Sequence, residues 1–326
     1  MTTNPTISVI VPTFNRRERL HLTLQSLAEQ VVDASFEVVV VSDGSSDGTD
    51  DVLRNGETPL RVEPRFQHNQ GPAAARNLGI DTARGEFVVF IDDDIVADPN
   101  LLQHHLDAHR RLGDRAVVIG PMLNAPDFRY SAWVAWEQEM LAKQYRAMMA
   151  GQYSATSRQF YTGNASLRRR HLVEAGGFDT RFRRAEDVEL AFRLEALGLT
   201  FEFVPDAVGF HYAERSYESW EAAARAYGGN DVRFREELGS GTGAWSVGEK
   251  YRRQHVAVRA LVRAFLSAPP LRRWSMTVLR HQVTRSDELT RVRRAALSVI
   301  YATEYFSGAV DELGSTSQLW QIVRAT

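Results

Sequence analysis

The chain has 326 residues, of which 44% are hydrophobic, and its 39 Lys and Arg residues nearly balance its 41 Asp and Glu residues. This length suits one large domain, or one domain with an appendage. A net charge of −2 excludes the strong basic field that recruits nucleic acid. Because the chain has no cysteine, disulfides, thiolate catalysis and a cysteine-based zinc site are excluded as well.

The amino-terminal sequence MTTNPTISVIVPTFN lacks the basic start and the apolar core of a signal peptide. No later apolar run approaches the roughly 18 residues of a membrane-spanning helix. We therefore expect a cytoplasmic protein without a nucleic-acid partner. It is either soluble or held peripherally at the inner face of the membrane.

The first part of the chain alternates short β-branched runs with helical patterns, which predicts a mostly parallel sheet flanked by helices. Two of the runs, VVVV and FVVFI, are apolar throughout, as in strands that are covered on both faces. The predicted strands are residues 7–11, 36–41, 60–62, 87–91 and 116–119, and the predicted helices are residues 16–30 and 73–83, the second opened by Gly71 and Pro72. Trp133 and Trp136 have helical spacing, which favours the core over a sugar-binding platform.

From about Ser216 the alternation ends and only helical patterns follow. They cover residues 220–238, 249–266 and 288–305, with breaks at GSGTGAW and SAPP. We therefore divide the chain into an α/β domain, residues 1–215, and a helical region, residues 216–326. This helical region is rich in arginine. The arginines either bind an anionic membrane surface or a lipid diphosphate, or they cover solvated helix faces in a chain with only two lysines.

Polar segments follow the predicted strands, at the edge of the sheet where ligands of such folds collect. Three acids, Asp92, Asp93 and Asp94, come directly after FVVFI. Adjacent carboxylates repel one another, and a bound cation relieves that repulsion; oxygen ligands select Mg²⁺ or Mn²⁺. The alternative is a solvated acidic turn, which is the simpler interpretation for Asp93. Asp43 is likewise either a turn residue beside Gly44 or part of a site.

Five segments occur in a fixed order: VIVPTFNRRERLHLTLQSL, VVVVSDGSSDGT, GPAAARNLGIDTARGEFVVFIDDDI, TGNASLRRRHLVEAGGFD and AEDVELAFRLEALG. Their order and spacing over residues 6–212 resemble the family 2 glycosyltransferases, which have the A-type glycosyltransferase fold. The resemblance implies a Rossmann-like sheet flanked by helices, here with a helical appendage. It also implies that a sugar is transferred with inversion from a nucleoside diphosphate sugar, with UDP the expected carrier. The acceptor would be a hydroxyl-bearing saccharide, lipid-linked molecule or small molecule, and Mn²⁺ or Mg²⁺ would assist.

The resemblance also assigns roles to residues of the donor site. Asp92 and Asp94 match the outer acids of the family's Asp-x-Asp motif, so Asp94 would bind the metal and Asp92 would face the ribose. Asp43 matches the acid that binds the nucleobase. The other residues expected at the nucleotide are Pro12, Thr13, Asn15, Arg76 and Asp93.

Inverting transfer needs a carboxylate that deprotonates the acceptor hydroxyl. Within the resemblance Asp187 matches this catalytic base, and Glu186 matches a neighbour that orients the acceptor or the base. Without the resemblance, the alternative is that Asp187 and Glu186 are acids that stabilise the start of a helix.

Three further residues carry weaker assignments. His211 is either a half-buried histidine or a metal ligand. Gly163 and Asn164 resemble the segment that lines the donor-sugar and acceptor pocket; the alternative is a turn glycine and an asparagine that satisfies backbone groups.

Two other classes of protein are alternatives to a glycosyltransferase. A sugar-phosphate nucleotidyltransferase shares the sheet and the metal, but it needs a glycine-rich phosphate loop where this chain has Pro12-Thr13-Phe14-Asn15. A non-catalytic sugar-nucleotide-binding protein would lose the metal or base acids, all of which are present.

Overall fold

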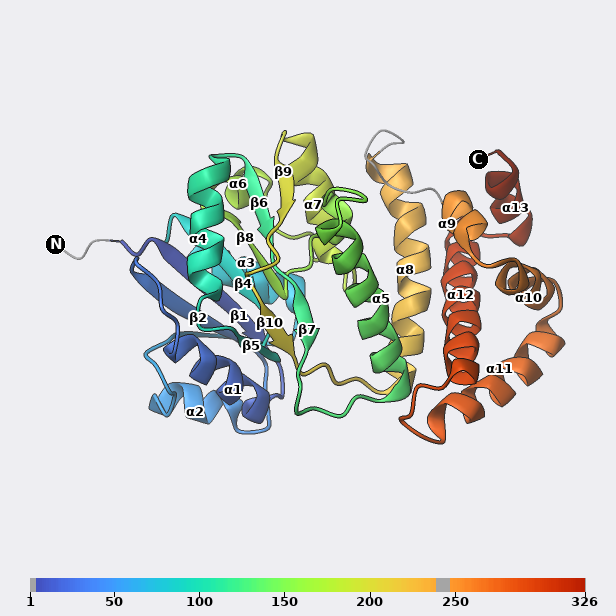
Figure 1. Ribbon diagram of the computed structural model, residues 1–326, viewed down its shortest axis with the longest axis horizontal. Coiled ribbons are helices and arrows are strands. Elements are labelled where there is room, and N and C mark those ends of the chain that lie inside the picture. The colour runs from blue at the N-terminus through green and yellow to red at the C-terminus, as the bar shows by residue number, and fades with distance from the viewer. Residues whose placement is uncertain (1–3, 239–246, 326) are drawn as a thin grey trace. The chain divides into compact units, whose positions relative to one another are not determined.

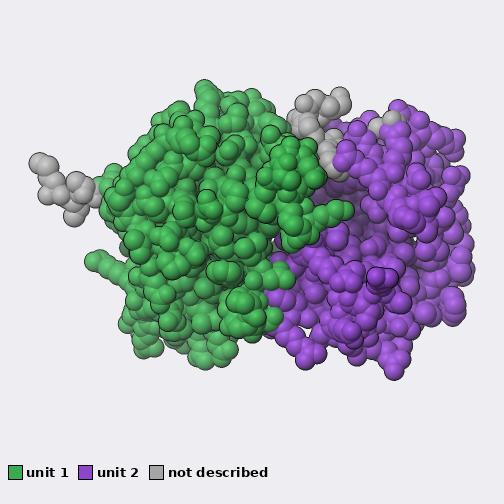
Figure 2. All heavy atoms as spheres, viewed as in Figure 1, with its two compact units in different colours: residues 1–128, 142–212 green, residues 129–141, 213–326 purple. Residues whose placement is uncertain are grey.

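A computed structural model describes residues 4–238 and 247–325 (Figure 1). Contacts divide the chain into two compact units (Figure 2): unit 1 holds residues 1–128 and 142–212, and unit 2 holds residues 129–141 and 213–326. Helix α5, Ala132–Met149, belongs to both units. The contact-based division thus differs from a boundary at residue 215, because residues 129–141 pack with the C-terminal helices. The predicted break at GSGTGAW lies outside the described residues.

Unit 1 is built on a seven-stranded sheet with the order β3-β2-β1-β4-β8-β6-β9. Every neighbouring pair is parallel except those of β8, which runs antiparallel to β4 and β6. This confirms the predicted mostly parallel sheet. The strands are β1 Ile7–Thr13, β2 Phe36–Asp43, β3 Glu63–Gln67, β4 Phe87–Ile91, β6 Ala116–Ile119, β8 Asn164–Arg168 and β9 Thr200–Phe203. A small second sheet has the order β5-β10-β7 and consists of β5 Ile95–Ala97, β7 Met122–Asn124 and β10 Gly209–His211.

Helices cover both faces of the large sheet. Along β1, Val9 and Val11 belong to one buried cluster and Ile10 to another, because successive side chains of a strand point to opposite faces. Both faces are therefore apolar, which explains the unbroken apolar runs. The helices of unit 1 are α1 Arg17–Ala28, α2 Thr49–Asn55, α3 Pro72–Thr82, α4 Leu101–Leu112, α6 Arg169–Glu174, α7 Glu186–Ala196 and the short 3₁₀ helix η1 Ser157–Gln159.

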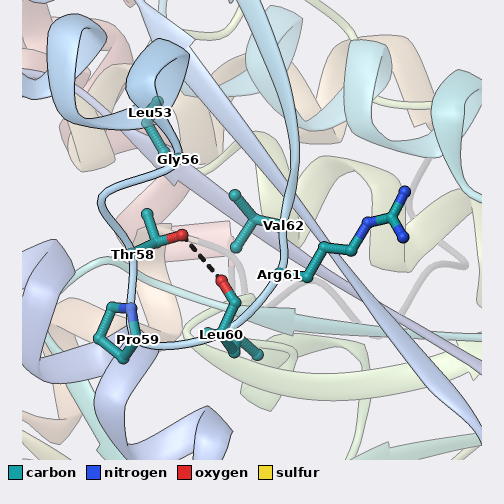
Figure 3. A pocket seen from close by; sticks show the side chains of 7 residues that line it. All are labelled: Leu53, Gly56, Thr58, Pro59, Leu60, Arg61 and Val62. Carbon is teal, nitrogen blue, oxygen red and sulfur yellow. Dashed lines mark hydrogen bonds between the residues drawn. The ribbon is translucent and has the colours of Figure 1, made fainter.

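The predicted strand at residues 60–62 is wrong. Strand β3 begins at Glu63, and the predicted residues lie in the preceding loop, where they line a pocket of about 380 Å³ with Leu53, Gly56, Thr58 and Pro59 (Figure 3). β3 is an edge strand without a buried residue, and it includes Pro64, which is tolerated at an edge. Its polar sequence, EPRFQ, therefore carries no apolar signal. The pocket lies at the N-terminal end of β3, whereas Asp92, Asp93 and Asp94 follow the C-terminal end of β4.

Unit 2 is helical within its described residues. Its helices are α8 Tyr217–Leu238, α9 Val247–Arg253, α10 Val256–Ser267, α11 Pro269–Thr284, α12 Arg291–Leu313 and α13 Thr316–Ala325. The predicted helix over residues 249–266 is interrupted at His255, which accepts a hydrogen bond from the backbone N–H of Ala257 and so caps α10. The SAPP segment starts a helix that the sequence did not predict, because Pro269 and Pro270 occupy the first turn of α11.

The tryptophans of α5 lie in the apolar packing of unit 2, as predicted. Trp136 is buried, and its ring lies 5.9 Å from that of Trp220 and 5.2 Å from that of Tyr301. Trp133 is partly buried against the same cluster. Within the described residues no helix has the length and apolar character to cross a membrane.

Candidate active site

The acids and the loop residues singled out above lie at the edge of the sheet where the parallel strands end. Thr13 is the last residue of β1, Asp43 is the last residue of β2, and Asp92 directly follows β4. Because β1 pairs in parallel with both β2 and β4, these ends lie side by side. The hydroxyl of Thr13 donates to Oδ2 of Asp93 at 2.7 Å, which joins the end of β1 to the acids. Pro12 precedes it in β1, in register with Val41.

The carboxylate of Asp43 is occupied by the protein itself. It accepts hydrogen bonds from Nε2 of Gln67 at 2.7 Å and from the backbone N–H groups of Gln70 and Gly71, both at 2.8 Å. The residue is 5% exposed. Asp43 thus fixes the loop that leads from β3 into α3. The predicted contact with a nucleobase stays a prediction, and the observed contacts are with this loop.

The loop after β1 is tied to the loop after β2 through Asn15. Its side-chain oxygen accepts from the backbone N–H of Ser46 at 2.7 Å, and its own N–H donates to the hydroxyl of Ser45 at 3.0 Å. Asn15 has a φ of 53°, in the left-handed region that asparagine tolerates better than most residues. The next residue, Arg16, is therefore held over the acids.

Arg16 contacts two of the three aspartates. Its guanidinium donates to Oδ2 of Asp94 and lies 3.5 Å from Oδ1 of Asp93. Burial opposes ionisation of Asp94, yet His211 and Arg16 outweigh it and hold the pKa of that carboxyl well below its ordinary value. For Asp93, burial and the neighbouring charge of Asp94 raise the pKa to about 7. The acids therefore differ in charge although they are adjacent in sequence.

Arg76 links the two groups of acids that the sequence separates by almost a hundred residues. From α3, its Nη2 donates to Oδ1 of Asp92 at 2.7 Å and its Nη1 donates to Oε1 of Glu186 at 2.8 Å. Arg76 is only 5% exposed, and its Nε has no hydrogen-bond partner among the described residues. Burial lowers the pKa of Arg76, but the two carboxylates outweigh it and raise the pKa above its ordinary value. The guanidinium therefore acts as a permanent internal cation.

The acid pair stands at the start of α7. Ala185, the residue before it, has φ 57° and ψ 24°, a left-handed conformation that is strained for alanine. Among the described residues, only Ala185 and Asn15 combine a positive φ with a side chain, and both flank the acids. Such strain is concentrated at functional sites. Burial, followed by the charge of Glu186, raises the pKa of Asp187 to about 7.

Gly163 and Asn164 have different surroundings. A Cβ added to Gly163 would lie 2.5 Å from Sδ of Met122 and 3.1 Å from Oδ2 of Asp92, so this glycine lets the backbone approach both side chains. Asn164 is fully buried, and its amide donates to the carbonyls of Pro121 and Ala207 and contacts His105. The prediction that Asn164 lines the sugar pocket stays a prediction, and the observed contacts of its polar atoms are with groups inside the protein. These contacts fit the alternative, an asparagine that satisfies backbone groups.

The residues predicted as metal ligands lie together. His211 pairs with Ile95 in the small sheet, and its Nε2 lies 3.4 Å from Oδ1 of Asp94. A carboxylate that stays ionised and an imidazole nitrogen suit Mn²⁺ or Mg²⁺. Within residues 4–238 and 247–325, no three His, Asp or Glu side chains are grouped closely enough to hold a metal ion by themselves. The two residues thus fit a metal that completes its shell with water and phosphate oxygens.

Two features escaped the sequence prediction, one at the site and one buried outside it. Arg16 carried no signal, because the pattern NRRERL reads as the polar face of α1. The second feature is a buried network in which Ser166 contacts Nδ1 of His105 and Nε2 of His109, each at 2.8 Å. Burial lowers the pKa of His105 to about 4 and that of His109 to about 3, so both are neutral. Histidines four residues apart on α4 were the available signal.

Comparison with known proteins decides the family. The sequence model described as "Glycosyl transferase family 2" matches residues 8–177, more than half of the chain. The chain belongs to glycosyl transferase family 2. This confirms the family inferred from the five ordered segments, and the match covers Asp43, Arg76, the three aspartates and Gly163. The acid pair of α7 lies beyond the matched residues.

Similar curated proteins include other members of this family. The uncharacterized glycosyltransferase YfnE of Bacillus subtilis (strain 168) is 31% identical over an alignment of 253 positions, gaps included, that covers 63% of this chain and 64% of YfnE. The validoxylamine A glucosyltransferase of Streptomyces hygroscopicus subsp. jinggangensis is 32% identical over an alignment of 242 positions, gaps included, that covers 66% of this chain and 57% of that enzyme. The chain thus spans less than two thirds of the length of these relatives.

Solved structures confirm the fold. The mannosyltransferase PcManGT from Pyrobaculum calidifontis, solved with GDP-Man and Mn²⁺, has a TM-score of 0.65 at 22% identity and covers 96% of this chain and 88% of its own. TarS of S. aureus, solved with UDP-GlcNAc, has a TM-score of 0.54 at 19% identity and covers 95% of this chain and 92% of its own. The chain therefore has the predicted A-type glycosyltransferase fold, with helices at its C-terminus.

Proposed function

We propose that this protein transfers a sugar from a nucleoside diphosphate sugar to a hydroxyl group of an acceptor, with inversion and with a divalent metal at Asp94 and His211. One observation carries the proposal: buried Arg76 holds Asp92 and Glu186 at 2.7 and 2.8 Å and so brings a donor-binding motif beside an acid pair. Family membership supports the reaction class, and UDP remains the expected carrier.

The chemistry of the step then follows from the residues. Asp187 is the proposed base, and it takes the proton of the acceptor hydroxyl as that oxygen attacks the sugar carbon opposite the diphosphate. Arg76 keeps Glu186 in place beside it. Asp43 fixes the loop from Gln67 to Gly71, against which the base of the nucleotide is proposed to bind. When bound, the metal supplies positive charge that offsets the charge developing on the diphosphate.

The two alternatives receive less support. A nucleotidyltransferase needs backbone N–H groups from a glycine-rich loop after β1, whereas Thr13 and Asn15 of this chain are engaged with Asp93 and with the β2 loop. A non-catalytic binding protein has no need of the acid pair that Arg76 holds beside Asp92. The cytoplasmic location stays a prediction.

The experiment that tests the proposal separates donor binding from transfer. A thermal-shift screen of sugar nucleotides with Mn²⁺ identifies the donor, because a ligand that binds the folded state raises its stability. Asp187→Asn is then expected to keep donor affinity near that of the parent protein and to lower transfer about 10²- to 10⁴-fold. Asp206→Asn, which changes an exposed acid of the same unit, is the matched control and should leave both unchanged.

Two results would contradict the proposed mechanism. Transfer by the Asp187→Asn protein at nearly the parental rate would show that Asp187 is only a helix-start acid. A product that keeps the anomeric configuration of the donor would exclude a single inverting displacement. Release of the nucleoside diphosphate, measured with and without an acceptor, distinguishes transfer from hydrolysis and from binding alone.

A further inference from the structure

One segment of unit 2 has an extreme charge. Residues 250–286 contain eight arginines and one lysine but no Asp or Glu, although the chain as a whole has a net charge of −2. The segment includes α10 and α11, which both contact α12 (Figure 1). Lys250 is paired with Asp231, Arg272 with Glu304 and Arg280 with Glu218. The remaining arginines still concentrate one sign of charge, which attracts a surface of the opposite sign.

Helix α11 carries apolar residues on two opposite faces. On its inner face Met276, Leu279 and Val283 pack in the core cluster that contains Trp220 and Ile300. On its outer face Leu271, Trp274 and Val278 follow the i, i+3, i+7 spacing of one helix face and are 45%, 68% and 43% exposed. The inner face explains why α11 packs against the other helices of unit 2. The outer face buries nothing among the described residues.

Arginines stand beside this outer face. Arg273 and Arg285 form no ion pair among the described residues, whereas Arg272 bonds Glu304 on the inner side at 2.7 Å. Arg285 follows Val278 by seven residues and therefore extends the same side of the helix. In α10, which leads into α11 through Ala268, the exposed residues include Ala257, Ala260, Leu261 and Ala264, while Val262 and Phe265 are buried.

We propose that the outer face of α11 binds an anionic phospholipid membrane. A helix that lies in a membrane interface has an apolar face with an aromatic residue and basic residues that reach the headgroups. In this arrangement Trp274 enters the boundary between headgroups and acyl chains, and Arg273 and Arg285 face lipid phosphates. The proposal is independent of the sugar transfer proposed above.

The charge of the outer face of α11 favours a membrane over a second copy of this chain as its binding partner. A symmetric dimer through this face would place the same patch on both sides of the interface. Arg273 and Arg285 would then meet identical unpaired arginines, and like charges across an interface are unfavourable. An anionic bilayer complements both the apolar residues and the arginines. It also requires no spanning helix, since interfacial helices lie in the plane of the membrane.

Vesicle flotation of the full chain tests the proposal. The vesicles are pure phosphatidylcholine in one series and an equimolar mixture with phosphatidylglycerol in the other. We expect binding to the mixed vesicles that weakens with salt, and little binding to pure phosphatidylcholine. Trp274→Ser and the double change Arg273→Gln with Arg285→Gln should each lower the affinity about 10- to 30-fold. Val173→Ser, at an exposed apolar residue of unit 1, is the control.

Every outcome bears on the proposal. No binding to mixed vesicles, or equal binding by the parent and all variants, overturns it. A dimer in size-exclusion chromatography that Trp274→Ser makes monomeric would instead identify a second copy as the occupant, and would also overturn it. Circular dichroism and the thermal melting curve show whether each variant is folded, and we expect no change because the replaced side chains are exposed.

Discussion

At the scale of single residues, Asp187 is the side chain whose environment makes the most specific prediction. Burial and the charge of Glu186 raise its pKa to about 7. A base works only when unprotonated, so activity should fall as the pH falls through that value. We expect kcat/KM to decrease about tenfold per pH unit below pH 7 and to level off above it.

Replacing Glu186 with Gln tests whether the charge of Glu186 raises the pKa of Asp187. The change removes a negative neighbour, and Arg76 stays beside the base, so the pKa of Asp187 should decrease and the pH profile should move to lower pH. Asp206→Asn should leave the midpoint unchanged. A midpoint that stays in place, or moves up, in the Glu186→Gln protein would mean that another group titrates in the profile.

Arg16 makes a second prediction at this scale. Its guanidinium lies against Asp94 and Asp93, where it would compete with the proposed metal ion for the same carboxylates. Arg16→Gln should therefore raise the affinity for Mn²⁺ alone, by roughly tenfold, the equivalent of one pKa unit of electrostatic interaction. It should also weaken binding of a nucleoside diphosphate, because guanidinium groups bind phosphates well.

Isothermal titration measures both affinities separately. Arg17→Gln is the control, since Arg17 is the exposed neighbour and, among the described residues, its side chain forms no ion pair with Asp93 or Asp94. If Arg16→Gln lowered the affinity for Mn²⁺, the guanidinium would be an organiser of the acids and not a competitor of the metal.

At the scale of elements, α8 and α12 show how glycine sets the distance between helices. A Cβ added to Gly228 would lie 1.7 Å from the carbonyl oxygen of Tyr305, and one added to Gly308 would lie 1.8 Å from that of Arg225. Backbone atoms cannot move aside as a flexible side chain can. The two helices therefore pack in close contact only because both positions lack a side chain.

Gly228→Ala should thus destabilise unit 2 by about 1–3 kcal/mol or more, the usual cost of overpacking, although alanine has the higher helix propensity. The adjacent Gly229 provides the matched control, because its added Cβ would meet its nearest neighbour at an ordinary 3.5 Å. Gly229→Ala should be neutral or stabilising by up to about 1 kcal/mol. Chemical denaturation of both variants measures the difference, and equal effects would contradict this account of the packing.

The elements also show what the sequence could predict. Strands β4 and β6 have the predicted bounds because their apolar runs begin and end sharply. Strand β3 could not be found, since it lies at a sheet edge without a buried residue. Helix α11 was missed because two prolines indicate a break, whereas they also fit a first helical turn. Local patterns therefore predict buried strands and fail at edges and helix starts.

The site was predictable for a different reason. The order of the five segments indicated the acids, but no pattern predicts that Arg76 contacts Glu186, which is 110 residues away. The resemblance assigned Gly163 and Asn164 to the sugar pocket, and only the fold shows that the amide of Asn164 bonds carbonyl groups inside the protein. Sequence motifs thus identify residue types at a site, while long-range contacts require the fold.

At the scale of the whole molecule, α5 determines whether unit 1 stays folded and monomeric without the C-terminal helices. Residues 129–141, which include the first turns of α5, belong to unit 2. Trp136 contacts Trp220 and Tyr301 there. A chain that ends at residue 215 keeps Trp136 but loses both partners. Exposed apolar surface of this kind leads to self-association.

We therefore expect a chain of residues 1–215 to aggregate or to elute as oligomers in size-exclusion chromatography. The same short chain with Trp133→Gln and Trp136→Gln should be monomeric, because its exposed apolar surface is reduced. It should also bind the sugar nucleotide and Mn²⁺ within a few-fold of the full chain, as the proposed site residues from Pro12 to His211 all belong to unit 1. Titration calorimetry provides this comparison. If the unsubstituted short chain were monomeric and bound the donor normally, a boundary at residue 215 would separate two independent domains, and the packing of Trp136 on the C-terminal helices would be dispensable for the first.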